Sequence, residues 1–71
     1  MQRKNVSSSN IKSIGYDEST STLEVEFLNG NIYQYSNVPE SLYINLMNAG
    51  SHGEYLDAYI KKGGYRYTKV R

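Results

Sequence analysis

The chain has 71 residues, a net charge of +1 and no cysteine. This length allows one domain with a small core, and the lack of cysteine excludes disulfides and a thiolate-held metal. No apolar run is long enough to span a bilayer, and no apolar segment of a signal peptide follows the basic start, so we expect a cytoplasmic protein that does not contact the membrane.

The beginning of the chain is polar and rich in serine, which predicts a flexible arm over residues 1–9 and a single domain over residues 10–71. The domain opens with a predicted strand that places Ile14 and Tyr16 on one face and Ile11 on the other, unless a bulge near residues 13–15 intervenes. A turn follows, because the Asp, Ser and Thr side chains after this strand bond their own backbone.

The strongest local pattern of the chain lies in residues 23–39. Leu23, Val25 and Phe27 alternate with two glutamates, which is the period of a strand with one buried face. Asn29-Gly30 then favours a hairpin turn, and a second strand rich in β-branched and aromatic residues follows it.

The length of this turn decides where Tyr33 and Tyr35 point. A two-residue turn pairs Phe27 with Ile32 and leaves both tyrosines on the outer face of the sheet. A three-residue turn, with Gly30 left-handed in a bulge, places both tyrosines in the core. We favour the bulged turn because it gives the larger single apolar face.

Two short helices are predicted after the hairpin. The first runs from Pro39 to residue 49, and Gly50 provides its stop. Ser51 and Glu54 have the spacing of a capping box and predict a second helix that continues to about Lys62. The apolar positions of the two helices are Leu42, Tyr43, Leu46, Met47, Tyr55, Leu56, Tyr59 and Ile60.

Together these elements predict an α+β fold, a three-stranded antiparallel meander with two short helices packed on one face. The tail, residues 65–70, alternates like a strand and can add a fourth, C-terminal strand at an edge of the sheet.

The residues suggest neither a catalytic nor a metal site. His52 is the only histidine, and no orienting partner for it is evident. Glu24 and Glu26 project from one face of their strand, and we interpret that face as the solvent face because nothing nearby indicates a cleft. Nucleophile-elbow and phosphate-loop motifs do not occur. We therefore predict no enzyme activity and no cofactor, and no small-molecule ligand is evident.

The most suggestive feature is the end of the chain, where cations alternate with tyrosines. Such cations bind phosphates and an exposed tyrosine stacks on an unpaired base, which predicts a nucleic-acid site. Alternatively, the tyrosines pack on the sheet and the cations only solubilise the end. The candidate residues are Lys61, Lys62, Arg66, Tyr67, Lys69 and Arg71, with Tyr33 and Tyr35.

Seven short segments carry a further signal. They are Val6–Ile11, Ile14–Asp17, Leu23–Phe27, Gly30–Tyr35, Val38-Pro39, Gly53-x-Tyr55 and the closing Tyr65-Arg66-Tyr67. In this order and spacing they resemble the KTSC domain family over about residues 6–70. Its central Tyr-x-Tyr corresponds to Tyr33 and Tyr35. That family occurs as small bacterial proteins and at the C-terminus of some lysyl-tRNA synthetases, so the resemblance implies RNA binding and transfers no catalytic residue.

Two functions are therefore expected from the sequence. The first is an RNA-binding module for structured or single-stranded RNA. The alternative is a protein-interaction or homodimerisation module, which would use an unpaired edge strand and a tyrosine-rich surface.

Overall fold

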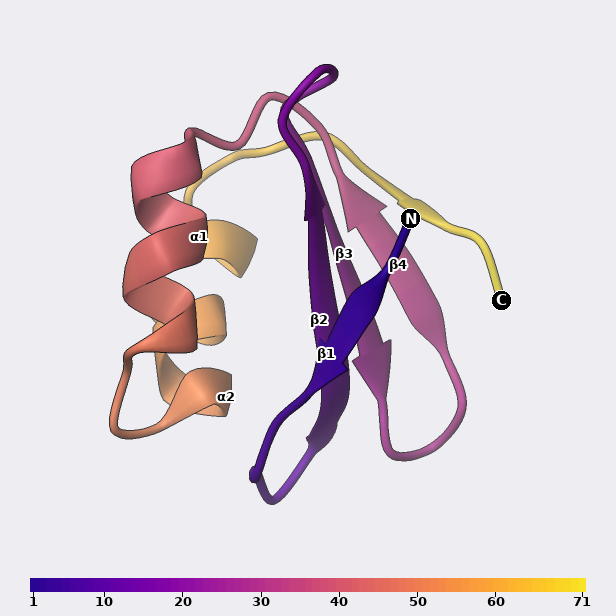
Figure 1. Cartoon of the computed structure of the whole chain (residues 1–71), viewed down its shortest axis with the longest axis vertical. Helices are drawn as coiled ribbons and strands as arrows, with labels where there is room; N and C mark the ends of the chain where they lie inside the picture. Colours follow the sequence, from indigo (N-terminus) through magenta and orange to yellow (C-terminus); the bar gives the residue numbers. More distant parts are fainter.

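The computed structural model describes all 71 residues and contains a five-stranded antiparallel sheet with helices on one face (Figure 1). Each strand pairs with the next one along the chain. The strands are β1 (Arg3–Asn5), β2 (Ile11–Asp17), β3 (Thr22–Phe27), β4 (Ile32–Tyr35) and β5 (Tyr67–Lys69). The helical layer consists of α1 (Glu40–Met47), α2 (His52–Tyr55) and the π-helix η1 (Leu56–Lys61).

The α+β class and the meander are confirmed, but the predicted count of three or four strands is too low. The C-terminal strand is present as β5, and a fifth strand, β1, lies within the segment predicted as an arm. In β1, Arg3 pairs with Gly15 and Asn5 with Ser13. Three polar residues carry no hydrophobic periodicity, so only their pairing with β2 identifies them as a strand.

The predicted bulge in the first part of the domain lies slightly earlier than expected, between Ile11 and Ser13. The extra residue, Lys12, restores the phase of the side-chain alternation. Ile11 and Ile14 are therefore both fully buried in the same core, which is the outcome of the bulged alternative and not of the regular strand.

The turn between β3 and β4 has the bulged form that the sequence favours. Val25 pairs with Tyr33 and Leu23 pairs with Tyr35, so both tyrosines lie on the helix-facing side of the sheet. Gly30 has a φ of +93°, a conformation that L-residues with a side chain adopt at a cost.

The helices begin as predicted. Pro39 precedes α1 in an extended conformation, and Ser51 accepts a hydrogen bond from the Glu54 N–H at the start of α2. However, α1 ends at Met47 rather than at residue 49. Asn48 ends it early, because its side-chain amide donates to a carbonyl of the last turn at 2.9 Å.

The core lies between the sheet and the helices, where α1 supplies Leu46 and η1 supplies Leu56 and Ile60. Tyr59 was predicted to be buried but is 56% exposed. Its ring contacts the tilted ring of Tyr55 at a centroid distance of 4.5 Å, because the wider π-helical turn keeps Leu56 and Ile60 toward the sheet and rotates Tyr59 outward. The core members are Ile11, Ile14, Leu23, Val25, Phe27, Tyr35, Val38, Leu46, Leu56 and Ile60.

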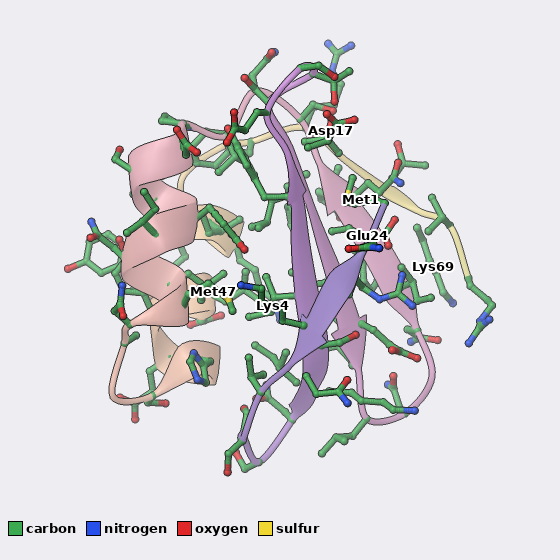
Figure 2. All side chains as sticks on the ribbon, viewed as in Figure 1. Met1, Lys4, Asp17, Glu24, Met47 and Lys69 are labelled. Atoms are coloured by element: carbon green, nitrogen blue, oxygen red, sulfur yellow. The ribbon has the colours of Figure 1, made fainter.

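The outer face of the sheet carries a buried charge cluster, although we expected it to face solvent. Glu24 and Glu26 are only 6% and 8% exposed. Arg3 forms ion pairs with both, and Figure 2 shows Glu24 beside β1 on the side away from the helices. Ser13 Oγ donates to Glu26 at 2.9 Å, and Gln34 Nε2 donates to Glu24 at 2.8 Å. The expectation failed because β1 brings Arg3 over these carboxylates.

Candidate functional site

A cavity of about 390 Å³ opens where β3, β4 and β5 meet the end of η1. The strand order produces it, because β5 pairs with β4 and so places Tyr67 beside Tyr35 and Lys69 beside Tyr33. We call this cavity the aromatic pocket. Its lining residues are Phe27, Asn29, Asn31, Tyr33, Tyr35, Lys61 and Tyr67.

Four rings contact one another around the aromatic pocket. Tyr33 meets Phe27 edge-to-face at a centroid distance of 5.8 Å and meets Tyr67 at 6.0 Å. Tyr35 lies 5.9 Å from Tyr67. These spacings are typical of favourable aromatic pairs. Tyr35 is buried while Tyr67 is 63% exposed, so the pocket has a rigid base and a ring whose surface is open to solvent.

Burial, with a smaller contribution from the neighbouring Tyr33 and Tyr67, raises the pKa of the Tyr35 hydroxyl to about 12. Tyr35 therefore stays neutral at physiological pH. It acts as a supporting ring and not as a base.

A single cation lies at the mouth of the aromatic pocket. Lys61, the last residue of η1, places its Nζ 5.1 Å from the centre of the Phe27 ring. A cation at this distance is attracted to the face of the ring, which orients the side chain while its ammonium group still donates hydrogen bonds.

The predicted site residues do not all lie together. Tyr33, Tyr35, Lys61 and Tyr67 line the aromatic pocket, and Lys69 lies beside it in β5. Figure 2 shows Lys69 at the edge of the sheet far from the helices.

Three other predicted cations lie outside the aromatic pocket. Arg66 lines a separate, mostly polar cavity of about 640 Å³ between the η1–β5 connection and the β4–α1 connection. Lys62 Nζ lies 3.5 Å from a carboxylate oxygen of Asp57 on the surface of η1. Arg71 directs its guanidinium toward Glu26, with Nη2 3.8 Å from Oε2, and so extends the charge cluster of the outer face.

The sequence reasoning missed three residues of the aromatic pocket. It assigned Phe27 to the core and Asn29 to a turn, and it gave Asn31 no role. In the structure the Asn31 N–H donates to Asn29 Oδ1 at 3.0 Å, which holds the turn against the pocket. The repeated asparagine around Gly30 is the one sequence signal that would have drawn attention to this turn.

The two glutamates and the histidine, which are the side chains best suited to acid–base catalysis, lie in different parts of the molecule. Glu24 and Glu26 lie on the outer face, whereas His52 lies among the helices with Nδ1 2.8 Å from the Leu46 carbonyl oxygen. Burial raises the pKa of Glu24, but hydrogen bonds from Gln34 and Arg3 outweigh it and hold the pKa below its usual value. The Ser13 hydroxyl likewise lowers the pKa of Glu26. Both carboxylates are ionised and paired.

No helix of the protein combines the length and the apolar character that a bilayer crossing requires.

Comparison with known proteins gives a consistent family match. The sequence model of the KTSC domain matches residues 7–67. The crystal structure of a KTSC domain protein from Yersinia pestis is similar to this one with a TM-score of 0.90 at 45% identity, and the match covers 99% of this chain and 97% of that chain. An uncharacterised protein of Stutzerimonas stutzeri is 37% identical over 70 residues, which is 99% of both chains.

The remaining relatives are much longer proteins. Lysine–tRNA ligases of Nostoc punctiforme and of a second Nostoc strain are 37% and 40% identical to this chain over 60 residues. The match covers 84% of this chain and 10% of each ligase, so the chain spans about a tenth of their length.

Proposed function

Because this chain belongs to the KTSC domain family, we propose that it is an RNA-binding module whose contact surface surrounds the aromatic pocket. The observation that carries the proposal is the convergence of Tyr33 and Tyr67 with Lys61 on one cavity. These residues come from three separate elements, and aromatic rings beside cations are the chemistry with which proteins hold unpaired nucleotides.

Cations without a carboxylate partner support the electrostatic half of the proposal, two of them at the aromatic pocket and one, Arg66, at the separate polar cavity. Lys61, Arg66 and Lys69 form no ion pair with a carboxylate, unlike Lys62 and Arg71. Unpaired cations are available to neutralise phosphates and release condensed counterions, which is the main source of affinity for RNA. We therefore assign the phosphate contacts to the first three residues.

The relatives support the same proposal. The Nostoc relatives are named lysine–tRNA ligases, so a region similar to this chain forms part of proteins that act on tRNA. A cytoplasmic location, expected from the sequence, belongs to this proposal because RNA is available there.

The test is a titration of a labelled single-stranded RNA of about 12 nucleotides at several salt concentrations. With three phosphate contacts, the logarithm of the affinity is expected to fall with the logarithm of the salt concentration with a slope of about −2. Substituting Lys61→Gln, Arg66→Gln and Lys69→Gln together is expected to abolish most of this slope.

Lys4→Gln is the matched control, because Lys4 is an exposed cation on β1 at the opposite edge of the sheet. It is expected to change neither affinity nor slope. Binding that is absent at about 50 mM salt, or that does not depend on salt, rejects the proposal.

A second candidate is protein association through β5. All three residues of this strand are exposed, and β5 pairs on one side only, so its outer edge is free to add a strand. Sedimentation of the pure protein tests self-association. A stable dimer that Lys69→Pro dissolves would favour this candidate, because the Lys69 N–H faces the free edge of β5, whereas the Thr68 N–H faces β4.

A further inference from the structure

The aromatic pocket has features that RNA binding through phosphates alone does not require. Phosphate contacts need only accessible cations, whereas this cavity is lined by four rings, two asparagines and one lysine. Its volume of about 390 Å³ is at the lower end of the range of small-molecule sites, about 300–1,000 Å³. This space suits one flat ring system rather than a base pair.

The rings offer a surface for stacking. Tyr35 is buried in the core, and Tyr33 packs edge-to-face between Phe27 and Tyr67. The rings of the pocket are therefore preorganised before a ligand binds. Tyr67 is 63% exposed, which leaves most of its ring without a protein partner. Every base has a π-face that can stack on such a ring.

The two asparagines at the rim supply directional polar groups. The side-chain oxygen of Asn29 is occupied by the Asn31 N–H, which orients that side chain and leaves its amide nitrogen free. The Asn31 side chain forms no hydrogen bond within the protein. An amide presents a donor and an acceptor side by side, which matches the edge of a base.

The flanking charges fit a nucleotide within a chain. Lys61 approaches the pocket from η1, and Lys69 lies beside Tyr33 in β5. Two cations from different elements match the phosphates that precede and follow one nucleotide.

From these contacts we infer that the aromatic pocket receives one unpaired base of a single-stranded RNA, with Tyr67 stacking on the base and Asn31 reading its edge. This inference rests on the proposed function and specifies it, because it requires single-stranded RNA and excludes recognition of a duplex. In a duplex the bases are stacked and paired, so the pocket has no base to hold.

The experiment compares a single-stranded RNA of about 12 nucleotides with a duplex of the same length at low salt, using the whole chain. The variant is Tyr67→Leu, which keeps an apolar side chain on β5 but removes the ring. Its matched control is Tyr59→Leu, because Tyr59 is a similarly exposed tyrosine that lies outside the pocket. Circular dichroism establishes that both variants are folded.

We expect Tyr67→Leu to weaken binding of the single strand about tenfold or more, whereas Tyr59→Leu leaves it unchanged. The wild type is expected to bind the duplex more weakly than the single strand. Among oligonucleotides of one base type, Asn31→Ala is expected to reduce the differences in affinity between bases.

The experiment distinguishes failure of the proposed RNA binding from failure of the base-pocket inference alone. A wild type that binds neither RNA rejects the proposed function and the inference together. Equal binding of duplex and single strand, or equal effects of Tyr67→Leu and Tyr59→Leu, leaves RNA binding in place and overturns the base pocket.

Discussion

At the scale of single residues, Gly15 on the outer face of the sheet has no side chain, and this leaves room for the buried ion pair between Arg3 and Glu24. Gly15 lies opposite Arg3 in β1 and opposite Glu24 in β3, in the strand between them. A Cβ on Gly15 would lie 2.6 Å from the Gln2 carbonyl oxygen and 3.0 Å from Cγ of Arg3. Because Gly15 has no side chain, the Arg3 side chain can cross β2 and reach the carboxylate of Glu24.

The first prediction concerns this close approach. Gly15→Ala is expected to displace β1 and to reduce the free energy of unfolding by about 1–3 kcal/mol, because backbone rather than a flexible side chain meets the added methyl. Gly50→Ala is the control, since nothing lies near its added Cβ. It is expected to destabilise by about 0.5 kcal/mol or less. Urea denaturation measures both, and equal effects would contradict the prediction.

The second prediction concerns the thermal stability of the protein at acidic pH. The pKa values of Glu24 and Glu26 are below their usual value of 4.5, so folding favours the ionised forms. Their contribution to stability is complete above the unfolded-state pKa and is lost as the pH falls from about 4.5 through the lowered folded-state values. We expect the melting temperature to decline in this window.

The corresponding variant is Glu24→Gln, which is expected to flatten the acid part of the melting curve because glutamine does not titrate. Glu54→Gln, an exposed position of α2 without a hydrogen bond to its carboxylate, serves as the control. Identical acid profiles for the two variants between about pH 7 and pH 3 would show that the charge cluster does not cause the decline.

At the scale of elements, the β3–β4 hairpin positions the aromatic pocket. Its three-residue turn sets the register that places Tyr33 and Tyr35 toward the helices, and a shift of one residue would reverse the orientation of both rings. The turn depends on Gly30, whose φ is +93° and whose N–H donates to the Phe27 carbonyl oxygen at 2.9 Å.

The third prediction tests this dependence. Gly30→Ala is expected to cost about 1–2 kcal/mol of folding free energy, because a Cβ is strained at positive φ although space surrounds it. Gly30→Asn is expected to cost less, since asparagine tolerates the left-handed region better than other residues. Thermal denaturation ranks the variants. An alanine variant as stable as the wild type would show that the turn relaxes without strain.

At the scale of the whole molecule, the two faces of the sheet have different charge states. On the outer face Arg3 and Arg71 are paired with glutamates, whereas Lys61 and Lys69 remain free beside the aromatic pocket. The two arginines and two glutamates of the outer face neutralise one another, so the positive potential beside the aromatic pocket comes from Lys61 and Lys69.

The fourth prediction follows from this asymmetry. When single-stranded RNA is added to isotopically labelled protein, we expect amide resonance shifts in β4, β5 and the end of η1. The amides of β1, at the opposite edge of the sheet, are expected to remain unchanged. Shifts centred on β1 would place the contact on another surface and contradict the proposed site.

Local patterns in the sequence determined several features of this protein. The alternation at Leu23, Val25 and Phe27 predicted β3, and Asn29-Gly30 predicted the turn. Ser51 predicted the cap of α2. These signals succeed because side-chain period, φ preference and capping act within a few residues of one another. The ordered segments that indicated the family also lie in the sequence, and the family match confirms them.

Only the tertiary structure decided the presence of β1, the burial of the charge cluster and the assembly of the aromatic pocket. Pairing between segments distant in the chain turned Arg3–Asn5 into a strand, buried Glu24 under Arg3 and separated Arg71 from the aromatic pocket. The same kind of pairing brought Tyr67 of β5 to Tyr33 of β4, next to Lys61. No periodicity encodes these contacts, because they depend on strand order and on which face each side chain occupies after the whole sheet has formed.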